Sequence, residues 1–123
     1  MRMGMEEEYK NAIEKKKELL LERWEVLEET RKIEKTIFEM EQKAKEIIVF
    51  QVDTKGKPLY SNAEKREIAL ASVLKENADY KKQLESREEI QKKLSKGEIE
   101  IQYLNDMLKY FYAVLRSDTN GRN

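Results

Sequence analysis

Residues 6 to 46 form an uninterrupted run without Gly or Pro that is dominated by Glu, Lys, Leu and Ile. Nothing in this run removes a backbone donor or favours a turn, so its good helix formers predict one long helix. Apolar residues recur in it at alternating steps of three and four, which is the heptad pattern of a helix that packs against another helix. The pattern predicts an all-α fold in which a partner helix covers this stripe.

The apolar seam of this first helix falls into two stretches. The later stretch consists of Ile33, Ile37, Met40, Ala44 and Ile47. The earlier stretch keeps the same rhythm through Ile13, Leu20, Trp24 and Leu27. Between Leu27 and Ile33 the phase slips through Thr30, so we predict an interrupted seam. Trp24 is the only Trp of the chain, and its place in the earlier stretch predicts a buried side chain.

Residues 47 to 60 differ in character from the helix that precedes them. Ile47 to Val52 are mostly β-branched or aromatic, and Asp53 to Pro58 have turn chemistry. We therefore predict a small β-hairpin over residues 48 to 60, at the tip of the molecule. An isolated two-stranded hairpin is only marginally stable, so it needs to pack on the helix ends or pair with another copy.

Residues 61 to 116 are predicted to form a second long helix. Ser61 and Glu64 have the spacing of a capping box, and Asn77 to Tyr80 predict a kink near residues 77 to 79. Residues 117 to 123 are expected to be a flexible tail. The predicted buried face consists of Ala69, Leu70, Val73, Leu74, Tyr80, Leu84, Ile90, Leu94, Ile101, Leu104, Leu108, Phe111 and Leu115.

Two long amphipathic segments joined by a short connector predict a single elongated unit, residues 1 to 123, folded as an antiparallel helical hairpin or coiled coil. Such a thin hairpin buries little surface for its length. We therefore expect an oligomer, or docking onto another protein, and the seam pattern leaves open whether the helices pair within one chain or between chains.

Several chemistries lack their usual residues here. The chain has no Cys and no His, so thiol nucleophiles and the commonest metal ligand and general base are missing. No Gly-rich phosphate-binding motif and no long apolar run occur. We expect a non-enzymatic cytoplasmic protein without cofactor, metal or small-molecule substrate. The 25 basic and 25 acidic residues balance, which argues against broad nucleic-acid binding.

The segment from residue 57 to 116 carries a family resemblance. Its features are Asn62 followed by Arg66, a Leu-rich helix, the acidic-Tyr pair Asp79-Tyr80 and the Tyr-Leu step Tyr103-Leu104. This pattern resembles small coiled-coil proteins of bacteriophage and mobile-element replication and recombination modules. Many of those proteins continue with basic residues after the Tyr-Leu step, whereas this chain has Asn105-Asp106-Met107. The resemblance implies a pathway, DNA recombination or replication, and no chemical activity.

Two groups of residues are candidates for binding a protein partner. A short hairpin cannot bury its own apolar side chains, and Asn62 and Arg66 share one face of a helix start. Tyr110 and Tyr112 lie near cations, where aromatic side chains can stack single-stranded bases, although packing or a protein contact suits them better. Asn62 and Arg66 have a structural alternative as a helix cap and an ion-pairing partner. The candidates are Val49, Phe50, Val52, Leu59, Asn62, Arg66, Tyr110 and Tyr112.

These features favour a non-catalytic accessory or adaptor protein that acts by protein–protein contacts. A single-strand-annealing or single-strand-binding protein is one partner that the resemblance implies, and direct contact with single-stranded DNA is weakly supported. One alternative is a prefoldin-like chaperone that assembles through its hairpins and holds clients at the Phe111 end. Another is a small phage-encoded inhibitor of a host protein.

Overall fold

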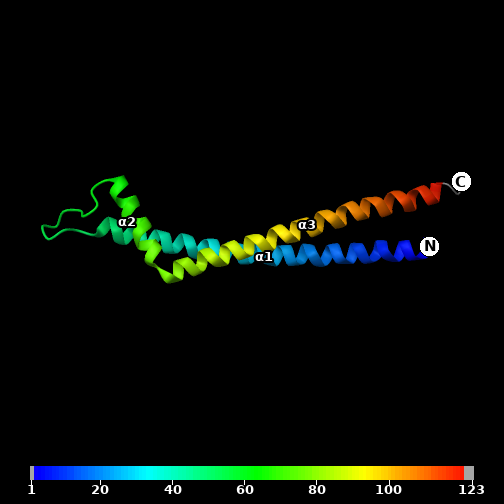
Figure 1. Ribbon diagram of the computed structural model, residues 1–123, viewed down its shortest axis with the longest axis horizontal. Coiled ribbons are helices and arrows are strands. Elements are labelled where there is room, and N and C mark those ends of the chain that lie inside the picture. Colours follow the sequence, from blue (N-terminus) through cyan, green and yellow to red (C-terminus); the bar gives the residue numbers. More distant parts are fainter. Residues whose placement is uncertain (1, 121–123) are drawn as a thin grey trace. The chain divides into compact units, whose positions relative to one another are not determined.

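Within the residues that the structure describes there are three helices, labelled in Figure 1: α1 spans Arg2–Phe50, α2 spans Ala63–Glu76 and α3 spans Ala78–Asn120. This computed structural model describes the backbone of residues 2–120 and the side chains of residues 4–117. No strand occurs within the described backbone. The predicted all-α class is therefore confirmed.

The β-hairpin predicted over residues 48 to 60 does not form. α1 continues to Phe50, and the loop that follows contains one isolated antiparallel bridge, Val52 to Pro58, instead of paired strands. The β-branched residues Ile47 to Val49 are helical because Ile48 is buried at this end of α1, which outweighs their weak preference for strands.

The chain divides into two compact units. Unit 1 combines α1 as far as Glu28 with α3 from Gln91 onward. Unit 2 contains residues 29 to 90, which comprise the rest of α1, the loop, α2 and the start of α3. In each unit, segments far apart in the sequence pack together in opposite directions.

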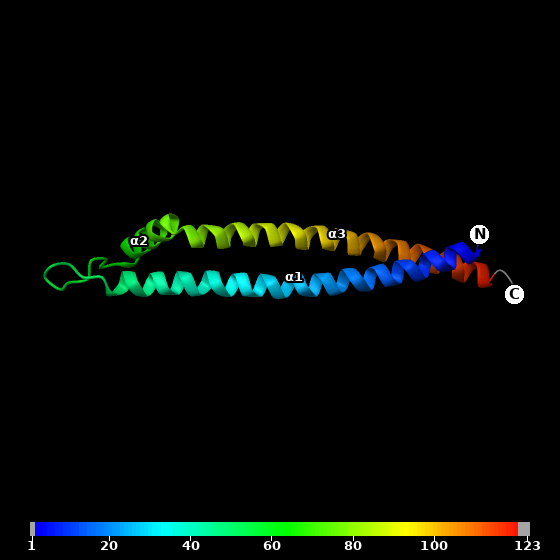
Figure 2. The same cartoon turned by 90° about the horizontal axis from the view of Figure 1, so that it is seen from below.

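Unit 1 is an antiparallel pair of helix segments (Figures 1 and 2). Its buried cluster consists of Ala12, Leu19, Ile101, Leu104 and Phe111, with Met5, Tyr9, Met107 and Leu108 packed around it. The ring of Tyr9 meets that of Phe111 edge to face, with centroids 6.5 Å apart. Across the pair, Arg23 Nε lies 2.6 Å from Glu98 Oε1. This core is only two helices thick, so each buried side chain contributes a large share of its stability.

The earlier half of the predicted α1 seam is wrong by one residue. The buried positions are Ala12, Leu19 and Val26, whereas Leu20 and Trp24 are exposed, Trp24 by 62%. From Val26 the steps run through Thr30 to Ile33 and Ile37 in regular alternation, so no phase slip occurs. Leu20 lies about 100° around the helix from the buried Leu19, and Ile13 lies at the same angle from the buried Ala12. The sequence therefore offers two registers, and packing selects the one that continues without a break.

Unit 2 is held by apolar burial and by two polar contacts between helices. Tyr80 donates its hydroxyl hydrogen to Glu41 Oε1 at 3.0 Å, and Arg87 Nη1 lies 3.6 Å from Glu34 Oε2. Burial raises the pKa of Tyr80, and the Glu41 carboxylate raises it further by accepting this hydrogen bond and by its charge, while Arg87 lowers it. The buried residues of this unit are Ile37, Ala44, Ile48, Ala69, Leu74 and Ile90.

Two predicted seam residues of unit 2, Ile47 and Val73, are exposed. At the end of α1 the buried residue that follows Ala44 is Ile48, four positions later, and not Ile47. The reason is that α2 covers this end of the helix, where Ile48 lines a cleft together with Leu70 of α2. In α2 the buried side chains are Ala69 and Leu74.

The helix ends also refine the predictions. Asn62, and not Ser61, caps α2, with its Oδ1 accepting from the backbone N–H of Lys65 at 2.8 Å. The helix is interrupted at Asn77, between α2 and α3 and inside the range of the predicted kink. The Asn77 side chain accepts a hydrogen bond from the backbone N–H of Tyr80 at 3.1 Å. α3 continues to Asn120, so residues 117 to 120 of the predicted tail are helical. The remaining tail, residues 121 to 123, lies outside the described residues.

Candidate functional site

The strongest candidate site is an apolar surface where α1 ends and the following loop begins. Four of the predicted partner-binding residues are exposed there: Val49, Phe50, Val52 and Leu59. Phe50 is exposed by 78%. We call these four residues the loop surface. A cluster of large apolar side chains on a small protein is a recognised mark of an interaction site.

The loop that carries this surface is held by its own hydrogen bonds. Asp53 Oδ1 accepts from the backbone N–H groups of Lys55 and Lys57 at 2.8 and 3.0 Å. The Asp53 N–H donates to the carbonyl of Lys57, and Gly56, at φ +79°, donates to the carbonyl of Asp53. The left-handed φ of Gly56 closes the turn, because residues with a side chain rarely adopt that conformation. The turn chemistry predicted for Asp53 to Pro58 therefore orders this loop without strands.

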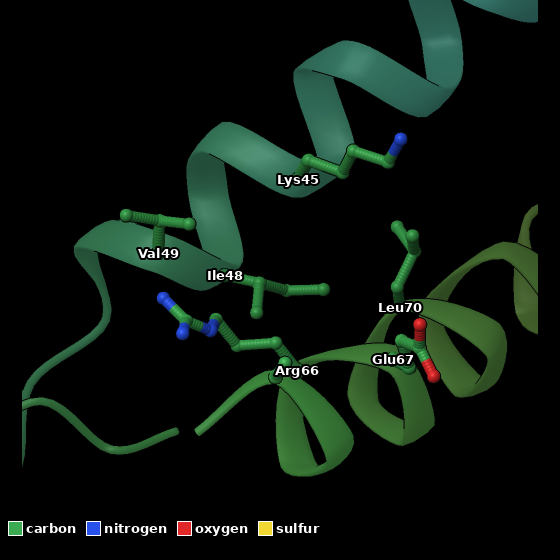
Figure 3. Close-up of a pocket in the computed structure, with 7 residues that line it drawn as sticks. Lys45, Ile48, Val49, Arg66, Glu67 and Leu70 are labelled. Atoms are coloured by element: carbon green, nitrogen blue, oxygen red, sulfur yellow. The ribbon is translucent and has the colours of Figure 1, made fainter. Parts of the chain in front are cut away.

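Beside the loop surface lies a cleft of about 270 Å³ between the end of α1 and the start of α2 (Figure 3). Its lining residues are Lys45, Ile48, Val49, Ala63, Arg66, Glu67 and Leu70. In Figure 3, Ile48 and Leu70 extend into the space between the helices, and the guanidinium of Arg66 lies near Val49. The walls are mostly apolar and the rim carries two cations and one carboxylate. Sequence reasoning did not find this cleft, because it depends on α2 folding back against α1.

Asn62 adopts the capping role that was its alternative to partner recognition, whereas Arg66 forms a hydrogen bond with a backbone carbonyl in place of the ion pair that was its alternative. The Asn62 side chain caps α2. Arg66 donates from Nε to the carbonyl of Asn62 at 3.3 Å. Arg66 also lines the cleft, so its remaining donors lie beside the loop surface. Of this pair, Arg66 is the residue that could contact a bound partner.

Tyr110 and Tyr112 belong to unit 1, whereas the loop surface belongs to unit 2. Both side chains are exposed, and the ring of Tyr110 packs at a tilt against Phe111 with centroids 6.0 Å apart. Tyr112 borders a shallow hollow with Lys16 and Lys109. Tyr110 and Tyr112 are two residues apart, which places them on different faces of α3, so they do not form one aromatic platform.

Among the described residues, no group of three or more His, Cys, Asp or Glu side chains could hold a metal ion. Within the same residues, no helix has a stretch long and apolar enough to span a bilayer. What the loop surface and its cleft can do chemically is bind apolar side chains, with cations at the rim to attract carboxylates.

Comparisons with protein-family models, curated proteins and solved structures found no match to this chain. The resemblance to phage and mobile-element proteins therefore stays a prediction, as do the pathway and the partner that it implies.

Proposed function

We propose that this protein is a non-catalytic accessory or adaptor that acts by protein–protein contact, with the loop surface as its partner-binding site. The observation that carries the proposal is the exposure of Phe50 at the last residue of α1, next to a loop that is held by its own hydrogen bonds. Aromatic side chains dominate the binding energy of many interfaces. A preordered loop loses little conformational entropy on binding, which favours affinity.

The charges around the loop surface indicate the chemistry of the partner. Residues 45 to 67 contain five basic residues (Lys45, Lys55, Lys57, Lys65 and Arg66) and four acidic ones (Glu46, Asp53, Glu64 and Glu67), a net charge of +1. The chain as a whole is neutral. A partner that presents an apolar pocket bordered by carboxylates complements this surface.

The pathway in this proposal, DNA recombination or replication of a phage or mobile element, is supported by the resemblance of residues 57 to 116. The prefoldin-like alternative requires β-hairpins that pair between copies. Because the described loop contains only the isolated bridge between Val52 and Pro58, we do not favour it.

The test compares two variants that each place an Asp at an exposed Phe of α1. Phe50→Asp changes the loop surface, and Phe38→Asp changes a side chain that is 60% exposed elsewhere on the same helix. We expect a protein captured by the wild type, identified and then purified, to bind Phe38→Asp normally and Phe50→Asp at least about tenfold more weakly. Circular dichroism should show the same helicity for all three proteins.

Equal affinity for the wild type and Phe50→Asp would refute the assignment of the loop surface. Fluorescence anisotropy of labelled single-stranded DNA provides the complementary control. Binding to DNA with a steep salt dependence, and no protein partner, would replace protein contact by backbone phosphate contact as the activity.

A further inference from the structure

α1 carries a second apolar stripe in unit 1, next to the one that it buries against α3. Ile13, Leu20 and Trp24 lie on it, and Leu21 lies at its edge, 58% exposed. With Lys17 and Leu27 the positions alternate in steps of four and three, the same rhythm as the buried stripe. Lys17 can lay its aliphatic stem along such a stripe. A helix with two adjacent stripes of this kind is typical of one that packs against more than one helix.

We propose that a second copy of this chain covers the stripe, with the two α1 helices antiparallel and related by a two-fold axis near Leu20 and Leu21. Around such an axis Leu20 and Leu21 meet their own symmetry mates, and a residue that lies a given distance before the axis meets the residue at the same distance after it in the other copy. Trp24 of each copy then packs against Leu20 of the other, within reach of the other copy's Lys17 for a cation–π contact.

The charge pattern of α1 favours a second copy and sets its direction. Residues 10 to 17 carry four Lys and one Glu, a net charge of +3, whereas residues 18 to 28 carry four Glu and one Arg, a net charge of −3. Antiparallel pairing brings the positive segment of each copy against the negative segment of the other. Parallel pairing would place like charges together, which is unfavourable.

The exposed area indicates how tight this dimer is. Covering Ile13, Leu20, Leu21 and Trp24 removes on the order of 400 Å² per copy from water, about half of what a standard stable interface buries on each partner. We therefore expect reversible association with a dissociation constant of roughly 10 to 100 µM. Higher salt should weaken it, because part of the attraction is between exposed charges.

The test is sedimentation equilibrium from about 1 to about 300 µM protein, a range that spans the expected dissociation constant. The wild type should pass from monomer to dimer, and the emission of Trp24, the only Trp, should shift to shorter wavelength over the same range. Leu21→Asp places two carboxylates near the two-fold axis and should weaken association at least about tenfold while leaving Trp24 as the probe. Ile99→Asp, at an exposed residue of α3 in the same unit, is the matched control and should associate as the wild type does.

A wild type that stays monomeric throughout the range would overturn this proposal, and so would a dimer that Leu21→Asp leaves intact. The proposal does not depend on the adaptor function. Phe50→Asp should leave the dimer unchanged, so loss of partner capture and loss of self-association are separate results.

Discussion

Leu19 and Leu20 are adjacent in α1, yet unit 1 uses them differently. Leu19 is 5% exposed and belongs to the buried cluster, whereas Leu20 is 41% exposed and lies on the second stripe. Replacing each by Ala removes the same atoms from neighbouring positions of the same helix, so the change in helix propensity is equal in the two variants. The difference between the unfolding free energies of the two variants therefore tests which of the two leucines packs against α3.

The expected magnitudes follow from burial. Leu19→Ala removes nearly fully buried carbons and leaves a cavity between Ala12, Ile101 and Leu104, at a cost of about 3 kcal/mol. Leu20→Ala removes a side chain that buries little more than half its surface, and water fills the space that remains. Its cost should be about 1 kcal/mol. A difference of about 2 kcal/mol is large for a domain whose total stability is of the order of 5 to 15 kcal/mol.

Urea unfolding followed by circular dichroism at 222 nm measures this difference. The protein concentration should be near 1 µM, well below the roughly 10 to 100 µM expected for dimer dissociation, so that loss of the second-copy contact does not contribute. Comparable m-values in the two variants would show that both unfold from the same folded state. If Leu20→Ala is as destabilising as Leu19→Ala, or more so, the seam passes through Ile13, Leu20 and Trp24 and the register described for unit 1 is wrong.

Three further outcomes can be checked on the same purified protein. Gly97→Ala should raise the free energy of unfolding by about 1 kcal/mol, measured in urea, because Gly97 lies inside α3 and, apart from its chain neighbours and the adjacent backbone of α3, no atom lies within 4 Å of an added Cβ; a loss of stability would contradict this. Gly56→Ala should cost about 1 kcal/mol and increase amide exchange at Lys55 and Lys57, since φ at Gly56 is +79°; an unchanged loop would show that the turn tolerates a side chain there. The pKa of Tyr80 is raised above the ordinary value of about 10, so its contribution to stability is complete below that pH and is lost as pH rises through the folded-state pKa. Absorbance titration near 295 nm should show one Tyr ionising later than the others, and Glu41→Gln should bring it back towards them; a titration that Glu41→Gln does not change would refute the assignment.

The seam of α3 in unit 1 was predicted correctly from the sequence because its residues are more apolar than those of the neighbouring series Tyr103, Met107, Tyr110 and Val114. Ile101, Leu104 and Phe111 are buried as expected, and Leu108 is half-buried. The residues that follow the first two, Gln102 and Asn105, are polar. On the other side of the seam, Tyr103 and Tyr110 carry hydroxyl groups that favour exposure, and both are exposed. In this segment the heptad pattern together with side-chain polarity identifies the helix face that packs against the partner helix.

The candidate site could be predicted only in part. The exposure of Phe50, Val52 and Leu59 agrees with the expectation that this connector cannot bury its own apolar residues. The expected strands were wrong, since the preference of β-branched residues for strands is small compared with the gain from burying Ile48 in the last turns of α1. The cleft beside it requires α2 to fold back on α1, which no local pattern indicates.

The sequence by itself determined the helical class, the interruption of the helix near Asn77, the turn at Asp53 to Pro58 and the α3 seam. These depend on local chemistry: breaker-free runs, capping side chains, a glycine at a left-handed position and periodic apolar residues. Only the tertiary structure decided the register of α1, since Leu19 and Leu20 are equally apolar and differ only in which one meets α3. It likewise decided whether Ser61 or Asn62 caps α2, because both side chains can accept the hydrogen bond and only the path of the folded backbone places one of them correctly.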